Sequence, residues 1–157
     1  MADSIRWAVS VTPVEELMDG QNEPHSVIHS DIGKSLGGSG VKNTTLMIYN
    51  SSFNVTGTGL ASSVQPSNFG GADDDVQVLF IKHLGINSDG DDEDAAVYVS
   101  VDDQDSSTIR IPNKEVSLVL SPVKSGQMSQ LQDIFFYHDS SIGAGENVTI
   151  EILCDAP

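Results

Sequence analysis

A two-residue alternation of apolar and polar side chains is the feature that most constrains what this sequence can fold into. Over residues 148–154 every even position is apolar, whereas Thr149 and Glu151 stand between them. Residues 97–101 and 116–120 carry Val or Leu at every second position in the same way. Because successive side chains of a β-strand point to opposite faces, this period predicts strands with one core face and one wetter face, as in antiparallel sandwiches.

The rest of the chain continues the strand pattern, with turn-rich segments in between. Residues 78–81 are apolar on both faces, which is typical of a central strand. Thr12, Pro13 and Glu15 offer the start of a helix, but Gly20 follows so soon that at most one short helix fits. Further strands are expected at residues 5–11, 27–28, 46–49, 76–84, 96–101, 108–111, 116–120, 134–138 and 148–154, with turns at 35–40, 66–75 and 140–146. We therefore expect an all-β fold, an antiparallel β-sandwich or jelly roll of about eight strands.

The length and composition suit one domain. A chain of 157 residues with 38% hydrophobic residues can build a single core. We expect one sandwich domain over residues 1–157, with residues 1–20 as a docking arm or as the first strand. No apolar run approaches the ~20 residues that cross a bilayer, and the N-terminal residues lack the pattern of a signal peptide. The single cysteine, Cys154, predicts synthesis in a reducing cytoplasm.

The net charge excludes several classes of partner. Seven Lys and Arg residues against 23 Asp and Glu residues give −16 at pH 7. Nucleic-acid binding depends on cations that displace counterions from phosphates, and anionic membranes attract cations in the same way. We therefore expect no nucleic-acid partner and no membrane partner.

A dense acidic run follows the strand that ends near Gly85, and it is the strongest candidate for a metal site. Its carboxylates could bind calcium, which takes six to eight oxygen ligands. The helix-loop-helix calcium pattern fails, because the sixth position counted from Asn87 is Asp92, where glycine is required. Charge runs usually point into water, so a solvated loop is favoured, with a calcium site as the alternative. The residues of that candidate site are Asp89, Asp91, Asp92 and Asp94.

The other candidate chemical sites fail on residue type or spacing. Residues 33–35 imitate the end of a phosphate-binding loop, but Ile28 stands where the earlier glycine is needed. Cys154 lies in the inward series of its strand, which favours a small core residue over a nucleophile. Four histidines, His25, His29, His83 and His138, fall in extended or loop segments without zinc-site geometry. We expect no catalytic residues, no cofactor and no enzymatic activity.

Four segments in the second half of the chain carry a family resemblance. They are Val76–Gly85, which contains the string Phe-Ile-Lys-His, then Ala96–Asp103, Ile109–Glu115 and Val148–Leu153. In this order they resemble the small β-sandwich virion proteins of tailed bacteriophages, in particular capsid decoration (cement) proteins. The resemblance covers roughly residues 76–154.

The resemblance implies a non-enzymatic virion structural protein, most simply a decoration protein that stabilises the capsid shell. Its expected partners are the major capsid protein or other virion proteins and further copies of itself. Its expected location is the outer capsid surface, after synthesis in the host cytoplasm. Two alternatives stay open: a tail or baseplate structural protein, and a carbohydrate-binding or receptor-binding β-sandwich module.

Overall fold

The computed structural model describes residues 3–10, 14–18, 24–28, 38–44, 46–70, 73–104, 109–124, 126–139 and 146–156. The chain divides into two compact units. One unit comprises residues 4–43, and the other comprises residues 1–3 and 44–157. We call the first the ribbon and the second the sandwich, and each is described by itself.

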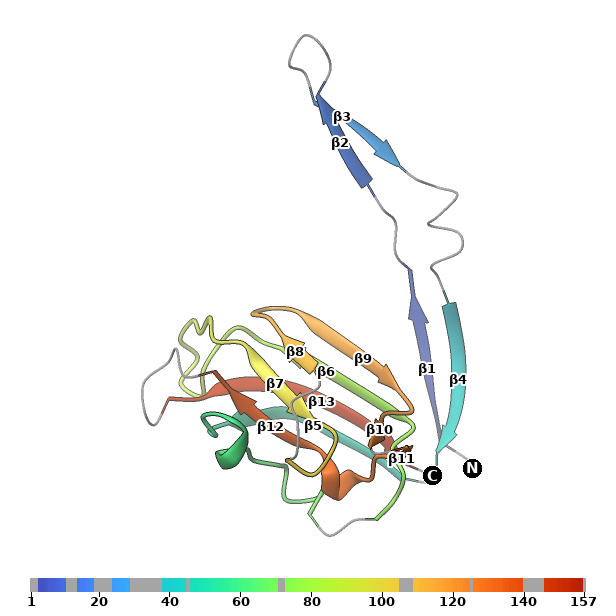
Figure 1. Cartoon of the computed structure of the whole chain (residues 1–157), viewed down its shortest axis with the longest axis vertical. Helices are drawn as coiled ribbons and strands as arrows, with labels where there is room; N and C mark the ends of the chain where they lie inside the picture. The colour runs from blue at the N-terminus through green and yellow to red at the C-terminus, as the bar shows by residue number, and fades with distance from the viewer. Residues whose placement is uncertain are drawn as a thin grey trace. The chain divides into compact units, whose positions relative to one another are not determined.

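The larger layer of the sandwich is a four-stranded antiparallel sheet. Strand β13 lies between β5 and β6, and β9 forms the edge beyond β6 (Figure 1). A shift of register interrupts the β5–β13 pairing between Ile150 and Ile152. The bounds are β5 Leu46–Val55, β13 Val148–Ala156, β6 Val78–His83 and β9 Val116–Leu120.

The smaller layer is a three-stranded antiparallel sheet in the order β12-β7-β8. A short hairpin, β10-β11, follows β9 in the chain and forms a two-stranded sheet of its own. Of the two 3-10 helices, η1 lies between β5 and β6 in the chain, and η2 lies between β11 and β12. The bounds are β12 Phe135–His138, β7 Val97–Ser100, β8 Ile109–Ile111, β10 Val123–Lys124, β11 Gln127–Met128, η1 Leu60–Ser62 and η2 Leu131–Asp133.

The core fills the space between these two sheets. One cluster of buried residues joins the inward side chains of the two sheets. It contains Val148, Ile150, Ile152 and Cys154 of β13, Val97 and Val99 of β7, and Phe136 of β12. Phe136 packs edge-on against Phe53 with ring centroids 5.7 Å apart, so an aromatic contact links the two layers. Fully buried members include Leu79, Ile81, Val97, Val99, Ile111, Phe136, Ile150 and Ile152.

The ribbon consists of two strand pairs. Strand β1 (Asp3–Val9) pairs with β4 (Gly38–Thr44), and β2 (Val14–Met18) pairs with β3 (Pro24–Ile28). The glycines of β4 make room for the indole of Trp7: a Cβ on Gly40 would lie only 2.8 Å from three of its ring atoms. Glycine inside a strand often marks such a close approach, so the position of the Trp7 indole accounts for the glycine at position 40.

The all-β fold expected from the sequence is confirmed, and no α-helix occurs among the described residues. The central position expected for residues 78–81 is also confirmed, since β6 pairs on both sides. No helix of the described part is long and apolar enough to cross a membrane.

Three local expectations were wrong. Val14–Met18 is a strand rather than the start of a short helix, because its pairing with β3 outweighs the local capping signal. Gly38–Gly40 belongs to β4 rather than to a loop. The apolar series at 116, 118 and 120 faces away from the core, and Val119 packs toward it instead. The single domain over residues 1–157 and the docking arm at residues 1–20 stay predictions, and the compact unit that contains residues 4–20 extends to residue 43.

Candidate interaction surface

The junction between β6 and the acidic run is a hydrogen-bonded corner. His83 is buried, with Nε2 2.8 Å from the carbonyl oxygen of Ala95, and its Nδ1 accepts a bond of 2.9 Å from the N–H of Gly85. Gly85 has φ +74°, and a Cβ there would lie 2.5 Å from side-chain atoms of Asn113 and Lys114. Both ring nitrogens of His83 are therefore occupied in holding the turn, as a structural residue.

The acidic loop beyond this corner is organised by backbone contacts and surface ion pairs. Asn87 accepts bonds from the N–H groups of Asp89 and Asp91, while Asp94 accepts one from the amide of Asn113. The candidate calcium ligands Asp89, Asp91, Asp92 and Asp94 are all exposed. Nowhere in the described ranges do three His, Cys, Asp or Glu residues come together as a possible metal site.

Cys154 lies where the sequence predicts, in the core. It is 1% exposed, and burial raises the pKa of its thiol from 9.0 to about 12, with a smaller rise from the neighbouring Asp155 carboxylate. A thiol that resists ionisation in this way is a poor nucleophile.

The remaining candidates do not form a site within the described residues. His138 is buried at the end of β12, with Nδ1 2.7 Å from the carbonyl oxygen of Asp139, and its Nε2 has no hydrogen-bond partner. His25 belongs to β3, whose side chains are not described. Both His29 and residues 33–35 lie outside the described residues.

The outward side of the four-stranded sheet is the most distinctive surface of the sandwich. The strand registers place Tyr49, Leu153, Phe80 and Leu118 in one row across all four strands. Because these positions alternate with core residues such as Ile48 and Cys154, their side chains point away from the core. We call this surface the outer apolar face, and define it as Tyr49, Leu153, Phe80 and Leu118 with the flanking Met47, Val116 and Leu120.

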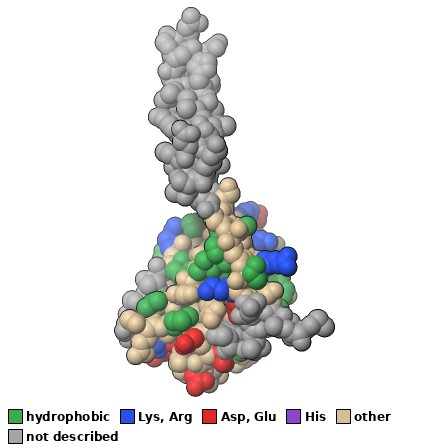
Figure 2. All heavy atoms as spheres, turned by 90° about the vertical axis from the view of Figure 1, so that its right-hand side faces the viewer, with side chains coloured by type: hydrophobic (Ala, Val, Ile, Leu, Met, Phe, Trp, Pro, Cys, Tyr) green, Lys and Arg blue, Asp and Glu red, His purple; other side chains and the backbone are tan. Residues whose placement is uncertain are grey.

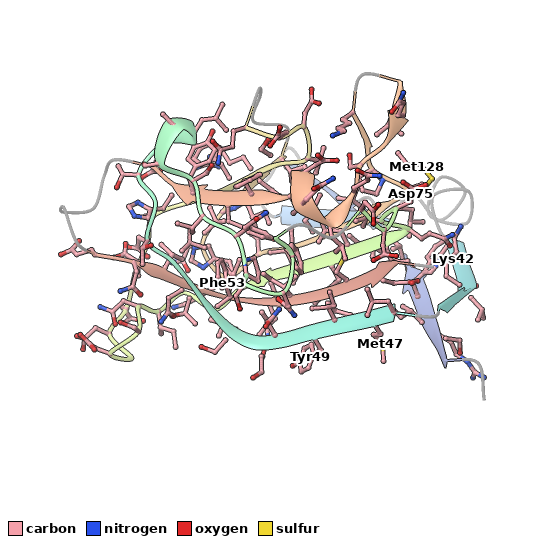
Figure 3. The ribbon with its side chains drawn as sticks, turned by 90° about the horizontal axis from the view of Figure 1, so that it is seen from below. Lys42, Met47, Tyr49, Phe53, Asp75 and Met128 are labelled. Carbon is pink, nitrogen blue, oxygen red and sulfur yellow. The ribbon has the colours of Figure 1, made fainter. Side chains whose placement is uncertain are left out.

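The outer apolar face is accessible at both edges. Tyr49 is 62% exposed and Met47 48%, and Figure 3 shows both side chains projecting from β5 away from the second layer, opposite in direction to Phe53. Val116, on the far edge strand β9, is 57% exposed. Phe80, Leu118 and Leu153 are partly buried between these edges. Contiguous exposed apolar surface of this kind marks interaction sites in soluble proteins.

The outer apolar face exposes little net charge. Asp155 lies in the same row as Met47 and Leu120, but it is fully buried. Lys82 and Glu151 lie in adjacent strands next to it and pair at 3.3 Å, so their charges offset each other. Figure 2 shows one side of the molecule, where hydrophobic and Lys or Arg side chains share the described surface and Asp or Glu side chains gather at its lower end. In a chain of net charge −16, a neutral apolar face is the surface on which another protein can approach with the smallest electrostatic penalty.

Sequence reasoning missed this surface because alternation does not say which side of a strand is buried. The series at 116, 118 and 120 looked like a core series, although the sheet turns it outward. One sequence signal could have revealed the surface. β6 is apolar on both faces, so one of those faces had to meet something other than the core.

The outward side of the smaller sheet carries a second distinct group. Tyr98 and Tyr137 face each other across β7 and β12 and stack with centroids 5.1 Å apart and planes 9° apart. Arg110 donates from Nε to the hydroxyl oxygen of Tyr98 at 3.3 Å. Stacking turns the ring faces toward each other, so the pair is not the open aromatic platform that sugars stack on.

Comparison of the chain with known protein families, with curated proteins and with solved structures found no match.

Proposed function

We propose that this chain is a non-enzymatic structural protein of a tailed-phage virion, an outer-capsid decoration protein that binds the assembled shell. The outer apolar face is the observation that carries the proposal. It offers a rigid, nearly neutral docking surface on a chain whose charge otherwise repels acidic neighbours. The sequence resemblance of residues 76–154 to decoration proteins supplies the class of partner.

The physical requirements of the proposal match the face. Binding energy at protein interfaces is concentrated in a few well-packed aromatic and aliphatic side chains surrounded by weaker contacts. Tyr49 and Phe80 stand in the same row, with Leu153 between them, in the part of the sheet where residues 152–155 of β13 pair in register with both neighbouring strands. A side chain on a rigid sheet loses little conformational freedom on binding, which favours affinity.

The test is co-sedimentation of the purified protein with particles of the phage that encodes it, prepared without this gene. Wild type should bind the particles and raise the temperature at which they release DNA. Tyr49→Asp should weaken binding by about thirtyfold or more, the scale of a central aromatic contact. Asn68→Asp is the matched control, because it adds the same charge at an exposed turn position outside the strands that form the outer apolar face.

The salt dependence separates this mode from simple charge attraction. Binding through the outer apolar face should persist or strengthen as salt is added, because ions screen repulsion between acidic partners. A protein that ignores the particles but binds glycans would contradict the proposal and favour the carbohydrate-binding or receptor-binding alternative. Attachment to tails instead of shells would favour the tail or baseplate alternative.

A further inference from the structure

Strand β9 ends the four-stranded sheet with an open hydrogen-bonding edge. Two bonds fix which of its groups face inward: the N–H of His83 donates to the carbonyl of Glu115 at 2.9 Å, and the N–H of Ser121 donates to the carbonyl of Gln77 at 2.8 Å. Because the pattern alternates along an antiparallel pair, the N–H and C=O groups of residues 117 and 119 also face β6. Those of Val116, Leu118 and Leu120 face outward, where the sheet order places no other described strand.

The same three residues carry the apolar side chains of the edge. Val116 is 57% exposed and Leu120 38%, and the strand Val116–Leu120 contains no charged residue and no proline. Natural sheet edges are usually protected by lysine, proline or a bulge, because an open apolar edge pairs with other strands. The chemistry of this edge therefore calls for an extended, uncharged strand as its partner.

We propose that the partner is β9 of a second copy of this chain, paired antiparallel about a two-fold axis through Leu118. In that register Leu118 faces Leu118 of the second copy, and Val116 faces Leu120 of the second copy. Each of these pairs exchanges two main-chain bonds, so every outward N–H and C=O group of the edge gains a partner. The side chains of these pairs are apolar and lie on one side of the joined sheet, while on its other side Ser117 faces Val119 of the second copy.

The distribution of charge permits β9 of a second copy as the partner, although the chain is acidic. Glu115 would lie opposite Ser121 of the second copy, and the two Glu115 side chains would be six residues apart along the joined strands. At the rise of a strand this is roughly 20 Å, beyond the ~8 Å screening length at physiological salt. No like charges face each other across the pair.

The dimer also deepens the proposed function. Joining two sheets edge to edge places the outer apolar faces of both copies on one continuous surface, so one dimer would dock on a particle through two equivalent faces. This part rests on the proposed function, but the dimer itself is tested on the purified chain with no particle present. Failure of the dimer proposal can therefore be distinguished from failure of the proposed function.

The experiment measures the mass of the full chain by analytical ultracentrifugation over a concentration series. Wild type should sediment as a dimer. Val116→Lys, which places a charge on the exposed edge in both copies, should raise the dimer dissociation constant by at least about tenfold. Val123→Lys is the matched control, because Val123 is 56% exposed but belongs to β10, and it should leave the dimer unchanged.

A cysteine placed on the axis tests the register. Leu118→Cys should be linked to its own copy by a short bis-maleimide, because the Cα atoms of a hydrogen-bonded facing pair lie only about 5.5 Å apart. Val123→Cys should not, and the native Cys154 is buried and does not compete. A monomeric wild type, or a dimer that Val116→Lys leaves unchanged and Leu118→Cys fails to cross-link, would overturn the proposal.

Discussion

The thiol of Cys154 shows how a single residue couples the core to pH. The folded protein holds its pKa at about 12 because burial removes the thiolate from water, whereas the ordinary value is 9.0. As pH rises, the Cys154 thiol therefore ionises in the unfolded chain before it ionises in the folded protein. The stability that the buried thiol supports is complete below about pH 9 and is lost progressively as pH rises toward 12.

We predict that the free energy of unfolding of wild type falls by about 1.4 kcal/mol more between pH 8 and pH 10 than that of Cys154→Val, because one pH unit above the unfolded pKa corresponds to that amount. Urea denaturation of both proteins at the two pH values measures the difference. Cys154→Val should remain folded at pH 8, since valine suits the same buried site. Equal losses in the two proteins would show that the thiol titrates at its ordinary pKa in the fold.

At the scale of elements, the acidic loop between β6 and β7 is held mainly by hydrogen bonds between its backbone and two side chains, Asn87 and His83. Asn87 caps the turn, His83 fixes its entry, and the Asp92–Lys114 pair spans 3.7 Å with side chains 89% and 64% exposed. Exposed ion pairs contribute about 0–1 kcal/mol. The exposed carboxylates are therefore dispensable for the fold of the loop, whereas the carboxylate of Glu93 accepts a hydrogen bond from the N–H of Ala95.

Changing Asp91, Asp92 and Asp94 together to Asn should leave the melting temperature nearly unchanged, or raise it slightly by removing like charges. Adding calcium should give wild type no stabilisation that the triple variant lacks. Differential scanning calorimetry with calcium and with chelator measures both effects. A rise in the wild-type melting temperature on adding calcium, lost in the triple variant, would establish the calcium alternative.

Strand positions were readable from the sequence, but their partners were not. The strands around residues 78–83, 97–100, 135–138 and 148–156 have strong apolar or β-branched patterns, so local composition reveals them. β10 and β11 are two residues long, and β4 is rich in glycine and polar residues, so neither carries a pattern. The outer apolar face depends on which side of β9 meets β6, and that follows from pairing between residues far apart in sequence.

At the scale of the whole molecule, the chain separates into units with independent strand pairing. β1 pairs with β4 and β2 with β3, so within the described strands the ribbon contributes none to either sheet of the sandwich. An arm cut at residue 20 would remove β1 and β2 and leave β3 and β4 without their partners. The natural boundary for deletion is the unit boundary at residue 43.

Deleting residues 1–43 should therefore leave a folded, β-rich sandwich whose melting temperature stays within about 5 °C of wild type, a change of roughly 1 kcal/mol for a domain of this size. Deleting residues 1–20 should be worse, because unpaired strands expose open edges and promote aggregation. Circular dichroism and light scattering distinguish the two variants. An unfolded 44–157 fragment would mean that the ribbon supplies part of the core.

The position of β13 also determines when the sandwich can fold during translation. This strand joins β5 to β6, yet it follows every other strand of the sandwich in the sequence. While the chain emerges from the ribosome, β5 and β6 both lack β13, the strand with which each of them pairs. This state lasts while about seventy further residues are translated, which takes some seconds at ~5–20 residues per second. The sandwich can close only after β13 clears the exit tunnel, so a ribosome stalled before residue 148 would hold a nascent chain that is collapsed but protease-sensitive.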